Sequence, residues 1–480
     1  MLPLLLIVLL SACEEPQPFE TRVSLIVDED NDPLADAAAI TVRIRLVDGT
    51  VIEDSQDIEG SELRLEGLER AEVATVEVEV RDADNAISGL GRSQAFDLGP
   101  AGLQAAIFVG AADSISRVPR ALTEGRTYAK GAWVPGGRIV VVGGGDNGEE
   151  TIAPVEFVGW DRKDPMMAVA GRDLPRIGHG VAWVPEGNGD WSGQVAVFGG
   201  THGAGDDTLA GGWENASASV SLVDPVNGDV TPDVAALDVG YMDFRTVTTA
   251  DGLFALIGGY NYNGPGDLPY TDHIVMIDPA SGEQVEGPAM PGGTNREQHA
   301  AVAFEAQGND FVLVTGGYVE GAGHLVRDLL WSGGASDDPV ILTRTDNPSR
   351  ARHQATDLGT GQVLISGGTT GMTGVFDDAT PVATGEIFDP AANGGSFEAI
   401  LSPMQEARQR HVAARIPGGR VLICGGQGAD GAALTSCEVF TMETRRFDAF
   451  PSAVSPGGPG MTAVPTGDGR VFLLGGATDL

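Results

Sequence analysis

The most regular feature of the sequence is a short, mostly apolar run that ends in two glycines. It occurs seven times, and successive glycine pairs lie about 50 to 60 residues apart. The runs are Ile139–Gly144, Val195–Gly200, Phe254–Gly259, Val312–Gly317, Val363–Gly368, Val421–Gly426 and Val471–Gly476. An apolar run of this length bounded by turn-forming residues predicts a buried β-strand. Most of the chain is therefore a repeated unit built around one such strand.

Each repeat contains further strands in a fixed order. A strand precedes the apolar run, and a tight turn such as Pro135–Gly137 separates the two. Another strand follows and often ends in an Asp-Pro turn, as at Leu222–Pro225, Met276–Pro279 and Ile387–Pro390. In these features residues 100–480 resemble kelch repeats. The resemblance implies an all-β fold, a seven-bladed kelch-type β-propeller.

The seventh repeat bears on how such a ring closes, because it stops at Leu480 before its outer two strands. Residues 103–110 form an apolar run without a glycine pair, just ahead of the first full repeat. We expect this run to complete the last blade by pairing beside Val471–Leu474. Joining the two ends in this way would remove the last open strand edge.

Residues 19–98 precede the repeats and predict a separate small domain. Its expected strands are Thr21–Val27, Ile40–Val47, Glu62–Leu68 and Val73–Val80, the last with strict alternation of apolar and acidic residues. Strands and turns at this spacing suggest a small antiparallel β-sandwich. The segment from Val27 to Ala37 resembles the first hairpin of carboxypeptidase-regulatory or immunoglobulin-like modules.

The acidic turn of this hairpin has the opening spacing of a calcium loop, with Asp28, Asp30 and Asp32 at alternate positions. An EF-hand is rejected because no glycine occupies the sixth position and Ala39 occupies the twelfth. A solvated acidic turn is the favoured interpretation.

The N-terminus has the pattern of an exported protein. Residues 1–10 are almost wholly apolar but too few to span a bilayer, and Leu10-Ser-Ala-Cys13 follows. This tetrapeptide resembles the lipobox of bacterial lipoproteins. The resemblance implies a signal peptide at residues 1–12, acyl chains such as palmitate on Cys13, and a tether at 13–18. The residue after the cysteine is Glu14 and not Asp, a pattern that resembles lipoproteins sorted to the outer membrane. The protein would then face the periplasm or the cell surface. An ordinary signal peptide with an incidental cysteine is the alternative.

Two further cysteines, Cys424 and Cys437, remain once Cys13 is assigned to lipid. An even pair in an oxidising compartment predicts a disulfide. Cys424 ends the sixth apolar run and Cys437 begins the next strand, so an antiparallel pair of strands would place them side by side.

Composition narrows the classes of function. The 69 glycines show no three-residue period, which excludes collagen. The chain has 68 acidic and 29 basic residues and a formal net charge of -39. So negative a surface repels phosphate backbones, and we expect no nucleic-acid partner. Two explanations of the acidity stay open: solubility in a salty or extracellular medium, and calcium binding.

An Arg-x-x-His pattern recurs where the first strand of a repeat begins. Its four occurrences are Arg176/His179, Arg296/His299, Arg350/His353 and Arg408/His411. A functional interpretation makes these residues a ring of ligands or proton donors around a central channel. The favoured interpretation is structural, because equivalent positions recur wherever blades recur. Rotated copies also spread the histidines around a circle instead of bringing them to one metal.

No nucleophile, zincin or phosphate-binding motif is present in the sequence. Galactose oxidase shares the kelch architecture, but its copper site needs paired tyrosine and histidine ligands and a tyrosine–cysteine crosslink. This chain has 6 tyrosines, and the two cysteines outside the lipobox are expected to pair with each other. We therefore predict no catalytic residues, no metal site and no cofactor, with calcium left as the open exception.

The loops that follow the glycine pairs are the expected ligand-binding face. They are long and uneven, notably residues 201–217, 260–271 and 369–384, whereas the turns at the other end of the strands are short. They contain aromatic residues with polar tips, which suit sugars and peptides. The candidates are His202, Trp213, Tyr260, Tyr262, Tyr270, Tyr318 and His324. The alternative is that these rings pack the long loops against one another.

Two functions remain open from the sequence alone. The favoured one is a non-enzymatic envelope lipoprotein whose propeller is a binding or scaffold surface for a protein or glycan, attached to the membrane only through its lipid. The alternative is a secreted carbohydrate-active enzyme with a pocket in the propeller, which a pair of carboxylates at the channel mouth would favour. The oligomeric state is not determined by the sequence.

Overall fold

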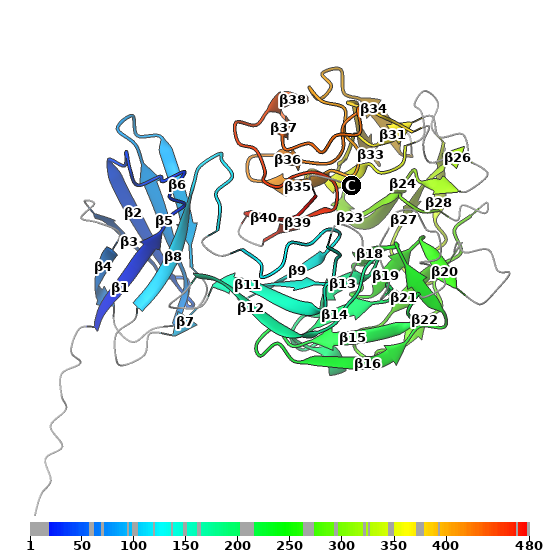
Figure 1. Ribbon diagram of the computed structural model, residues 1–480, viewed down its shortest axis with the longest axis horizontal. Coiled ribbons are helices and arrows are strands. Elements are labelled where there is room, and N and C mark those ends of the chain that lie inside the picture. Colours follow the sequence, from blue (N-terminus) through cyan, green and yellow to red (C-terminus); the bar gives the residue numbers. More distant parts are fainter. Residues whose placement is uncertain are drawn as a thin grey trace, which may run out of the picture. The chain divides into compact units, whose positions relative to one another are not determined.

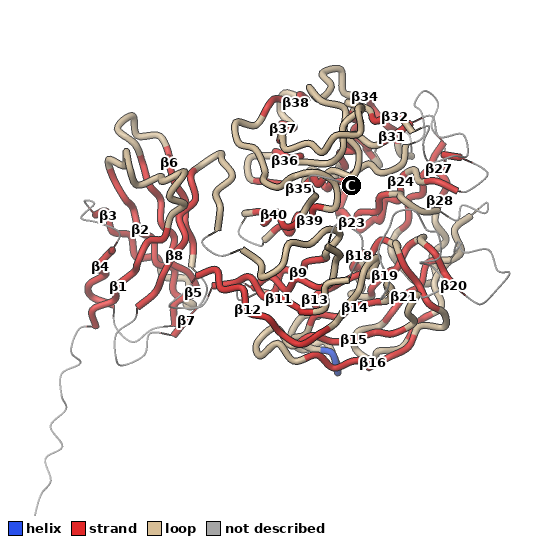
Figure 2. The backbone as a smooth tube through the Cα atoms, viewed as in Figure 1, coloured by secondary structure: helices blue, strands red, loops and turns tan. Residues whose placement is uncertain are grey.

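The computed structural model shows an all-β protein with a single short 3-10 helix, Gly189–Trp191, in the described part of the chain (Figures 1 and 2). It divides into two compact units, Met1–Pro119 with Trp160–Met166, and Arg120–Gly159 with Met167–Leu480. No described helix is long and apolar enough to cross a membrane. The described residues are 19–56, 62–68, 72–93, 96–97, 104–118, 121–135, 138–146, 151–160, 165–201, 216–262, 273–291, 296–319, 323–324, 327–343, 350–370, 379–391, 394–466 and 469–477.

The first unit contains one eight-stranded sheet in the order β3-β2-β5-β6-β8-β1-β4, with β7 also paired to β5. Its strands are β1 (Phe19–Ile26), β2 (Ala39–Leu46), β3 (Val51–Gln56), β4 (Glu62–Leu68), β5 (Glu72–Arg81), β6 (Ile87–Arg92), β7 (Phe96–Asp97) and β8 (Gln104–Ala111). Alternate residues of β1, β2, β5 and β8, such as Val23, Val42, Val78 and Ile107, meet in one buried core. The four strands expected from alternation in this region are confirmed as β1, β2, β4 and β5.

The position of β8 corrects two predictions. Residues 104–111 do not pair with the last propeller strand; they pair in parallel with β1 and antiparallel with β6. Ile107 and Val109 of β8 are fully buried in the core of the first unit. The first unit therefore extends about twenty residues beyond the predicted boundary at residue 98. Both predictions were wrong because the sequence of an apolar strand does not indicate which sheet the strand will join.

The acidic turn after β1 is held by its own backbone. The Asp28 carboxylate accepts the N–H groups of Asp30 at 3.2 Å and of Arg117 at 2.6 Å. The Asp32 carboxylate accepts the N–H of Leu34 at 2.8 Å. The bonds from Asp30 and Leu34 are the short-range bonds of an Asx turn, and the bond from Arg117 joins the turn to a segment 89 residues away in the sequence.

The second unit is a ring of sheets, six with four strands and one with two strands in the described residues. Sheet 1 contains β9 (Lys130–Val134), β10 (Arg138–Val142), β11 (Pro154–Trp160) and β12 (Pro165–Asp173); sheet 2, β13 (Gly180–Trp183), β14 (Val195–Phe198), β15 (Ser219–Val223) and β16 (Val230–Ala236); sheet 3, β18 (Arg245–Thr248), β19 (Phe254–Ile257), β21 (Ile274–Ile277) and β22 (Gln284–Val285); sheet 4, β23 (Ala300–Ala306), β24 (Asn309–Thr315), β27 (Arg327–Trp331) and β28 (Val340–Thr343); sheet 5, β29 (Gln354–Asp357), β30 (Val363–Ser366), β33 (Gly385–Asp389) and β34 (Ser396–Ala399); sheet 6, β35 (Val412–Ile416), β36 (Arg420–Cys424), β37 (Cys437–Thr441) and β38 (Arg446–Ala449); sheet 7, β39 (Met461–Pro465) and β40 (Val471–Gly475).

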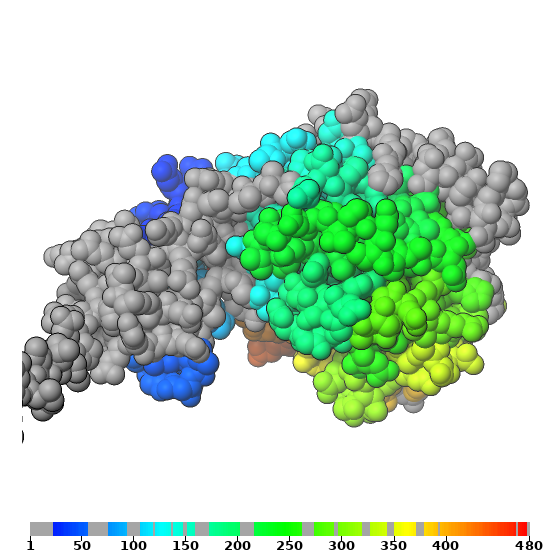
Figure 3. Space-filling model, turned by 90° about the horizontal axis from the view of Figure 1, so that it is seen from below, coloured from blue at the N-terminus to red at the C-terminus, as the bar shows by residue number. Residues whose placement is uncertain are grey.

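The loops contain three further strand pairs, β17 (Gly240–Met242) with β20 (Tyr260–Tyr262), β25 (Tyr318–Val319) with β26 (Gly323–His324), and β31 (Thr369–Thr370) with β32 (Thr380–Pro381). The first strand of every sheet lies beside the first strands of its two neighbours, and β39 lies beside β9 (Figure 1). The ring is therefore closed, as in a β-propeller, and the expected all-β propeller fold is confirmed. Where sheets 2 and 3 face outward, they form the green surface of Figure 3.

The ring closes by packing between first strands instead of by the predicted borrowed strand. The backbone N–H of Tyr128 donates to the carbonyl of Gly460 at 2.7 Å. A Cβ on Gly131 in β9 would lie 2.5 Å from a methyl group of Val464 in β39, so these two strands approach closely. Contact between the first and last sheets thus joins the ends of the ring.

The predicted disulfide is present in sheet 6. Cys424 and Cys437 lie directly opposite each other in β36 and β37, with their Cα atoms 4.2 Å apart, and their sulfurs are bonded. Both side chains are buried. The antiparallel register expected from the sequence therefore brings the two cysteines together.

Candidate functional site

Arginines at the first position of the Arg-x-x-His pattern bind the glycine pair of their own sheet in several sheets, whereas the Arg176 guanidinium donates to the carbonyl of Pro175 at 3.1 Å. In four sheets the guanidinium donates to the carbonyl of the first glycine of the pair. The bonds are Arg126 to Gly143 at 3.0 Å, and Arg296 to Gly316, Arg350 to Gly367 and Arg408 to Gly425 at 2.9 Å each. Arg126 was not recognised in the sequence because Ala129 takes the place of the histidine in that repeat.

Three of these arginines also form buried ion pairs that the sequence analysis missed. The pairs are Arg126–Glu156, Arg350–Glu386 at 2.5 Å and Arg408–Glu438 at 3.0 Å. Each glutamate belongs to the third strand of its sheet and is almost completely buried. A usable signal was present, since each glutamate lies near the start of a strand and is followed by apolar residues. Its partner lies about 30 residues away, so spacing alone did not reveal the pair.

The backbone of the same arginines joins neighbouring sheets. Their carbonyls accept the N–H of the second glycine of the preceding sheet, as from Gly317 to Arg350 at 2.7 Å and from Gly368 to Arg408 at 2.8 Å. A Cβ on the first glycine would collide with the same kind of carbonyl, at 2.1 Å between Gly316 and Arg350. The glycine pairs are therefore required by close contact between sheets.

The four histidines occupy separate junctions between sheets. The Nε2 of His353 lies 2.6 Å from the hydroxyl of Thr315, and that of His411 lies 2.9 Å from the hydroxyl of Ser366. Burial lowers the pKa of His179 and of His411 to about 3, and it lowers that of His299 as well. Buried histidine rings that lie at separate junctions do not come together as ligands of one metal, in agreement with the structural interpretation from the sequence.

One residue per sheet, directly before the histidine position, adopts the left-handed backbone conformation. We call these seven positions the axial ring, because they precede the first strands that surround the centre of the propeller. They are Tyr128 (φ 56°), Gly178 (66°), Asp243 (57°), Gln298 (52°), Arg352 (58°), Arg410 (53°) and Gly460 (75°). Five of them are not glycine, although side chains disfavour this conformation. Such recurrent strain is typical of functional positions.

Backbone hydrogen bonds link members of the axial ring head to tail. Tyr128 donates to Gly460 and Asp243 to Gly178, both at 2.7 Å. Arg352 donates to Gln298 at 2.8 Å, and Arg410 donates to Arg352 at 3.0 Å. Four of the seven junctions between neighbouring members thus have such a bond, and the seven positions surround the centre of the propeller at one end, which we call the channel mouth.

Polar side chains reinforce the mouth in sheets 4 to 6. Arg352 donates through Nε to the side-chain oxygen of Gln298 at 2.8 Å and through Nη1 to that of Gln409 at 3.0 Å. Gln409 in turn donates to Gln427 at 3.0 Å. Gln427 belongs to the loop that follows a glycine pair, so this network connects the axial ring to those loops. We call this end of the propeller the glycine-pair face.

Charged residues of sheets 1 and 3 interact across sheet 2. Lys130 interacts electrostatically with both Asp243 and Arg245, although sheet 2 stands between them. Sheet 2 has glycine at the equivalent positions, and a Cβ on Gly178 would lie 2.8 Å from the carboxylate of Asp243. Burial, and to a smaller extent repulsion from Arg245, lower the pKa of Lys130 to about 8 against the opposing effect of Asp243.

The predicted ligand-binding residues divide into three groups. Tyr260 and Tyr318 are buried, and the hydroxyl of Tyr260 donates to Glu297, so these two rings pack the loops and present no surface to solvent. This corrects their assignment and agrees with the packing alternative. Tyr262 and His324 lie in β20 and β26, but their side chains are outside the described residues. His202, Trp213 and Tyr270, like the lipidation candidate Cys13, lie outside the described residues altogether.

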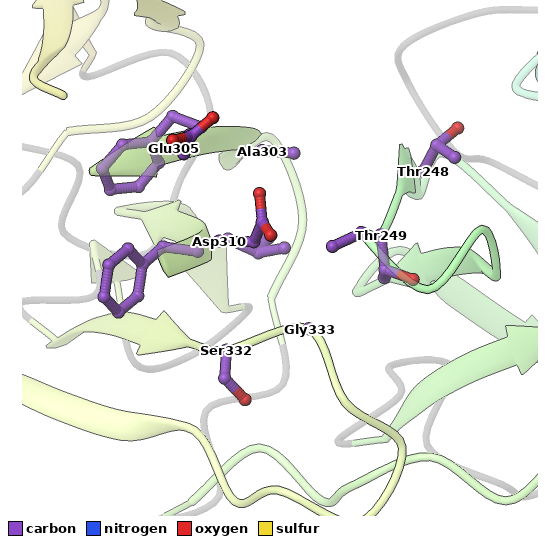
Figure 4. Close-up of a pocket in the computed structure, with 11 residues that line it drawn as sticks. Thr248, Thr249, Ala303, Glu305, Asp310, Ser332 and Gly333 are labelled. Atoms are coloured by element: carbon purple, nitrogen blue, oxygen red, sulfur yellow. The ribbon is translucent and has the colours of Figure 1, made fainter. Parts of the chain in front are cut away.

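A pocket of about 210 Å³ lies at the opposite end of the strands, between sheets 3 and 4 (Figure 4). Thr248 and Thr249 line one side, and Glu305 and Asp310 line the other. The two acidic residues face each other across the β23–β24 hairpin. This pocket therefore belongs to the face with short turns, not to the face that the sequence favoured for ligands.

No protein-family model and no curated protein matches the sequence. Solved structures resemble it at 15% identity. One, described as YjhT, has a TM-score of 0.49 and covers 69% of this chain and 99% of its own. Another, a fungal alcohol oxidase of the AA5 family in complex with copper, has a TM-score of 0.54 and covers 74% of this chain and 71% of its own. The second likeness supports the class of fold, a propeller-like all-β protein, and no more.

The residues of this chain do not reproduce a metal centre in the part that the structure describes. No three His, Cys, Asp or Glu side chains come together there as ligands. The two cysteines of the propeller are bonded to each other, which leaves neither for a crosslink to tyrosine.

Proposed function

We propose that this chain is a cell-envelope lipoprotein whose propeller binds a protein or glycan at the glycine-pair face. The axial ring carries this proposal. Its backbone conformation is the same in all seven sheets, but its side chains are aromatic, acidic, amide, basic or absent. A repeated scaffold that presents different side chains around one mouth is suited to recognising an irregular partner.

The test is a glycan and protein array probed with the chain from Glu14 to Leu480, followed by variants at the two ends of β35. Arg410 belongs to the axial ring, whereas Arg415 is half exposed at the other end and pairs with Asp357. Arg410→Asn removes the charge while keeping a residue that tolerates left-handed backbone. We expect it to weaken binding of any array hit at least about fivefold, and Arg415→Asn to change it less than about twofold. Equal effects of both variants would contradict the proposal.

The enzyme alternative has one feature in its support, the pocket that contains Glu305 and Asp310. Paired carboxylates are the machinery of glycoside hydrolysis. If the pocket is catalytic, the chain should hydrolyse members of a glycan panel, and both Glu305→Gln and Asp310→Asn should abolish the activity. Hydrolysis that survives both substitutions would exclude this pocket as its site.

The membrane attachment rests on Leu10-Ser-Ala-Cys13 alone. We propose that Cys13 is acylated and becomes the mature N-terminus, and that the protein is held at the outer membrane by this lipid. Mass spectrometry of the N-terminal peptide from the native bacterium should show diacylglycerol on Cys13. A mature start elsewhere, or an unmodified Cys13, would contradict the anchor without affecting the binding proposal.

A further inference from the structure

We infer that the charged cluster at the channel mouth, Lys130 and Arg245 with Asp243 beside them, binds an oxyanion, a carboxylate, sulfate or phosphate group of a small acidic ligand. The inference rests on the proposed function, because it names the chemistry of a ligand at the same face. Two observations support it. Lys130 and Arg245 lie within electrostatic range of each other, and the hydrogen-bond donors of their side chains are largely without partners in the described part of the chain.

The approach of the two cations depends on glycine in sheet 2. Position by position, Gly178 corresponds to Asp243 and Gly180 corresponds to Lys130 and Arg245. A Cβ on Gly180 would lie 2.1 Å from the hydroxyl of Thr246, so sheet 3 occupies the space that a side chain would fill. Sheets 1 and 3 are thereby able to place charged groups within electrostatic range across sheet 2, which has glycine at both equivalent positions.

The donors of the pair are available. Lys130 pairs with Val142 through its backbone, but its ammonium, which carries three donors, has no hydrogen bond or ion pair to any described residue. Arg245 donates through Nε to the carbonyl of His299 at 2.9 Å, which fixes its guanidinium plane. Its two terminal nitrogens have no partner among the described residues. A fixed guanidinium beside an ammonium is the donor arrangement that oxyanions prefer.

The electrostatic balance of the cluster also favours an anion. Burial opposes the charge on both cations, repulsion from Arg245 also opposes the charge on Lys130, and among the described residues Asp243 is the one carboxylate that offsets these effects. Two further arginines, Arg352 and Arg410, lie elsewhere on the axial ring. In a chain with a net charge of -39, this concentration of cations at one mouth is a local exception. A negatively charged ligand would relieve the repulsion and be drawn to this point.

The direct test is calorimetric titration of the chain from Glu14 to Leu480 with sodium sulfate, citrate and inorganic phosphate. We expect saturable binding of at least one anion. Lys130→Gln and Arg245→Gln should each weaken it at least about tenfold, because each removes a charge-assisted donor. Arg415→Gln removes one positive charge at the opposite end of a first strand and should leave affinity within about twofold. Absence of binding by all three anions, or equal loss in all three variants, would overturn the inference.

A second measurement separates direct contact from structural damage. Lys130 faces Arg245 and Asp243 from sheet 3 and His179 from sheet 2, which is neutral above about pH 3. His179 stays neutral between pH 7 and pH 9, whereas Lys130, with its pKa of about 8, loses its charge over this range. Because it loses its proton as pH rises, sulfate binding should weaken across this range. Lys130→Arg keeps its charge and should bind equally at both pH values, whereas a parallel decline in Lys130→Arg would contradict a contact through Lys130.

Failure of this inference is distinguishable from failure of the proposed function. If arrays identify a neutral ligand whose binding is lost in Arg410→Asn, and no anion binds, the glycine-pair face is a binding face but the cluster is no oxyanion site. If sulfate binds through Lys130 but the arrays show no partner, the oxyanion site is supported and the proposal of a macromolecular partner is contradicted. A thermal melt of each variant checks folding, and Lys130→Gln should melt no lower than the parent because it removes a desolvated charge.

Discussion

Arg126 and Gly475 lie in contact where the last sheet of the propeller meets the first. A Cβ placed on Gly475 would lie 2.2 Å from the carbonyl oxygen of Arg126. The same relation links Gly143 to Arg176 and Gly316 to Arg350, at 2.0 and 2.1 Å. The closing junction is therefore built like the others, and each junction depends on a glycine at one position.

Gly475→Ala should open this closing junction. Gly475 has φ 68°, so alanine is strained there and its Cβ also meets the Arg126 carbonyl. The matched control is Gly431→Ala, since Gly431 has φ 80° and nothing within 4 Å of its Cβ position. We expect Gly475→Ala to lower the free energy of unfolding by at least about 2 kcal/mol more than the control, measured by urea titration. Equal losses would mean that backbone strain alone explains the glycine.

Glu386→Ala should be strongly destabilising because it leaves the buried guanidinium of Arg350 without its carboxylate. Loss of one partner of a buried pair costs about 3 to 5 kcal/mol. Glu398→Ala breaks the exposed pair with Arg445 and should cost less than about 1 kcal/mol. Chemical denaturation of both variants compares the two pairs. A small effect of Glu386→Ala would show that water or a shifted side chain satisfies Arg350.

The buried histidines should make the propeller sensitive to acid. His411 has a pKa of about 3 in the folded protein against about 6.5 when unfolded, so between these values only the unfolded chain binds its proton. Stability from this group is complete above pH 6.5 and declines as pH falls, by up to about 1.4 kcal/mol per pH unit. His411→Gln should therefore show a shallower loss of stability between pH 6.5 and 4. His273→Gln, at an exposed histidine, is the control and should follow the parent curve.

Reduction of the Cys424–Cys437 bond should destabilise sheet 6. The bond closes a loop with a sequence separation of 13 residues, for which the chain-entropy model gives about 3 kcal/mol. Urea unfolding with and without reductant, on the parent and on the Cys424→Ala/Cys437→Ala double variant, measures this contribution. The double variant should be insensitive to reductant, and an equal response of both proteins would assign the effect to something other than the disulfide.

Local sequence patterns predicted the parts of this protein that depend on neighbours along the chain. The spacing of the glycine pairs indicated the propeller. The position of Cys437 at the start of the strand after Cys424 was sufficient to predict their bond. Alternation predicted strands β1, β2, β4 and β5 in the first unit. In each case the pattern indicates which face of a strand is apolar or where the chain turns. Both are local properties of the sequence.

The tertiary structure alone decided which distant segments meet. Residues 104–111 are as apolar as a propeller strand, but they are buried beside β1 and β6 because the core of the first unit lacked a strand there. Tyr260 is a residue type that often contacts ligands, but its ring is buried and its hydroxyl donates a hydrogen bond to Glu297. The Lys130–Arg245 cluster exists because sheet 2 has glycine between them. Such contacts depend on competition among surfaces far apart in the sequence, and no local pattern records the outcome of that competition.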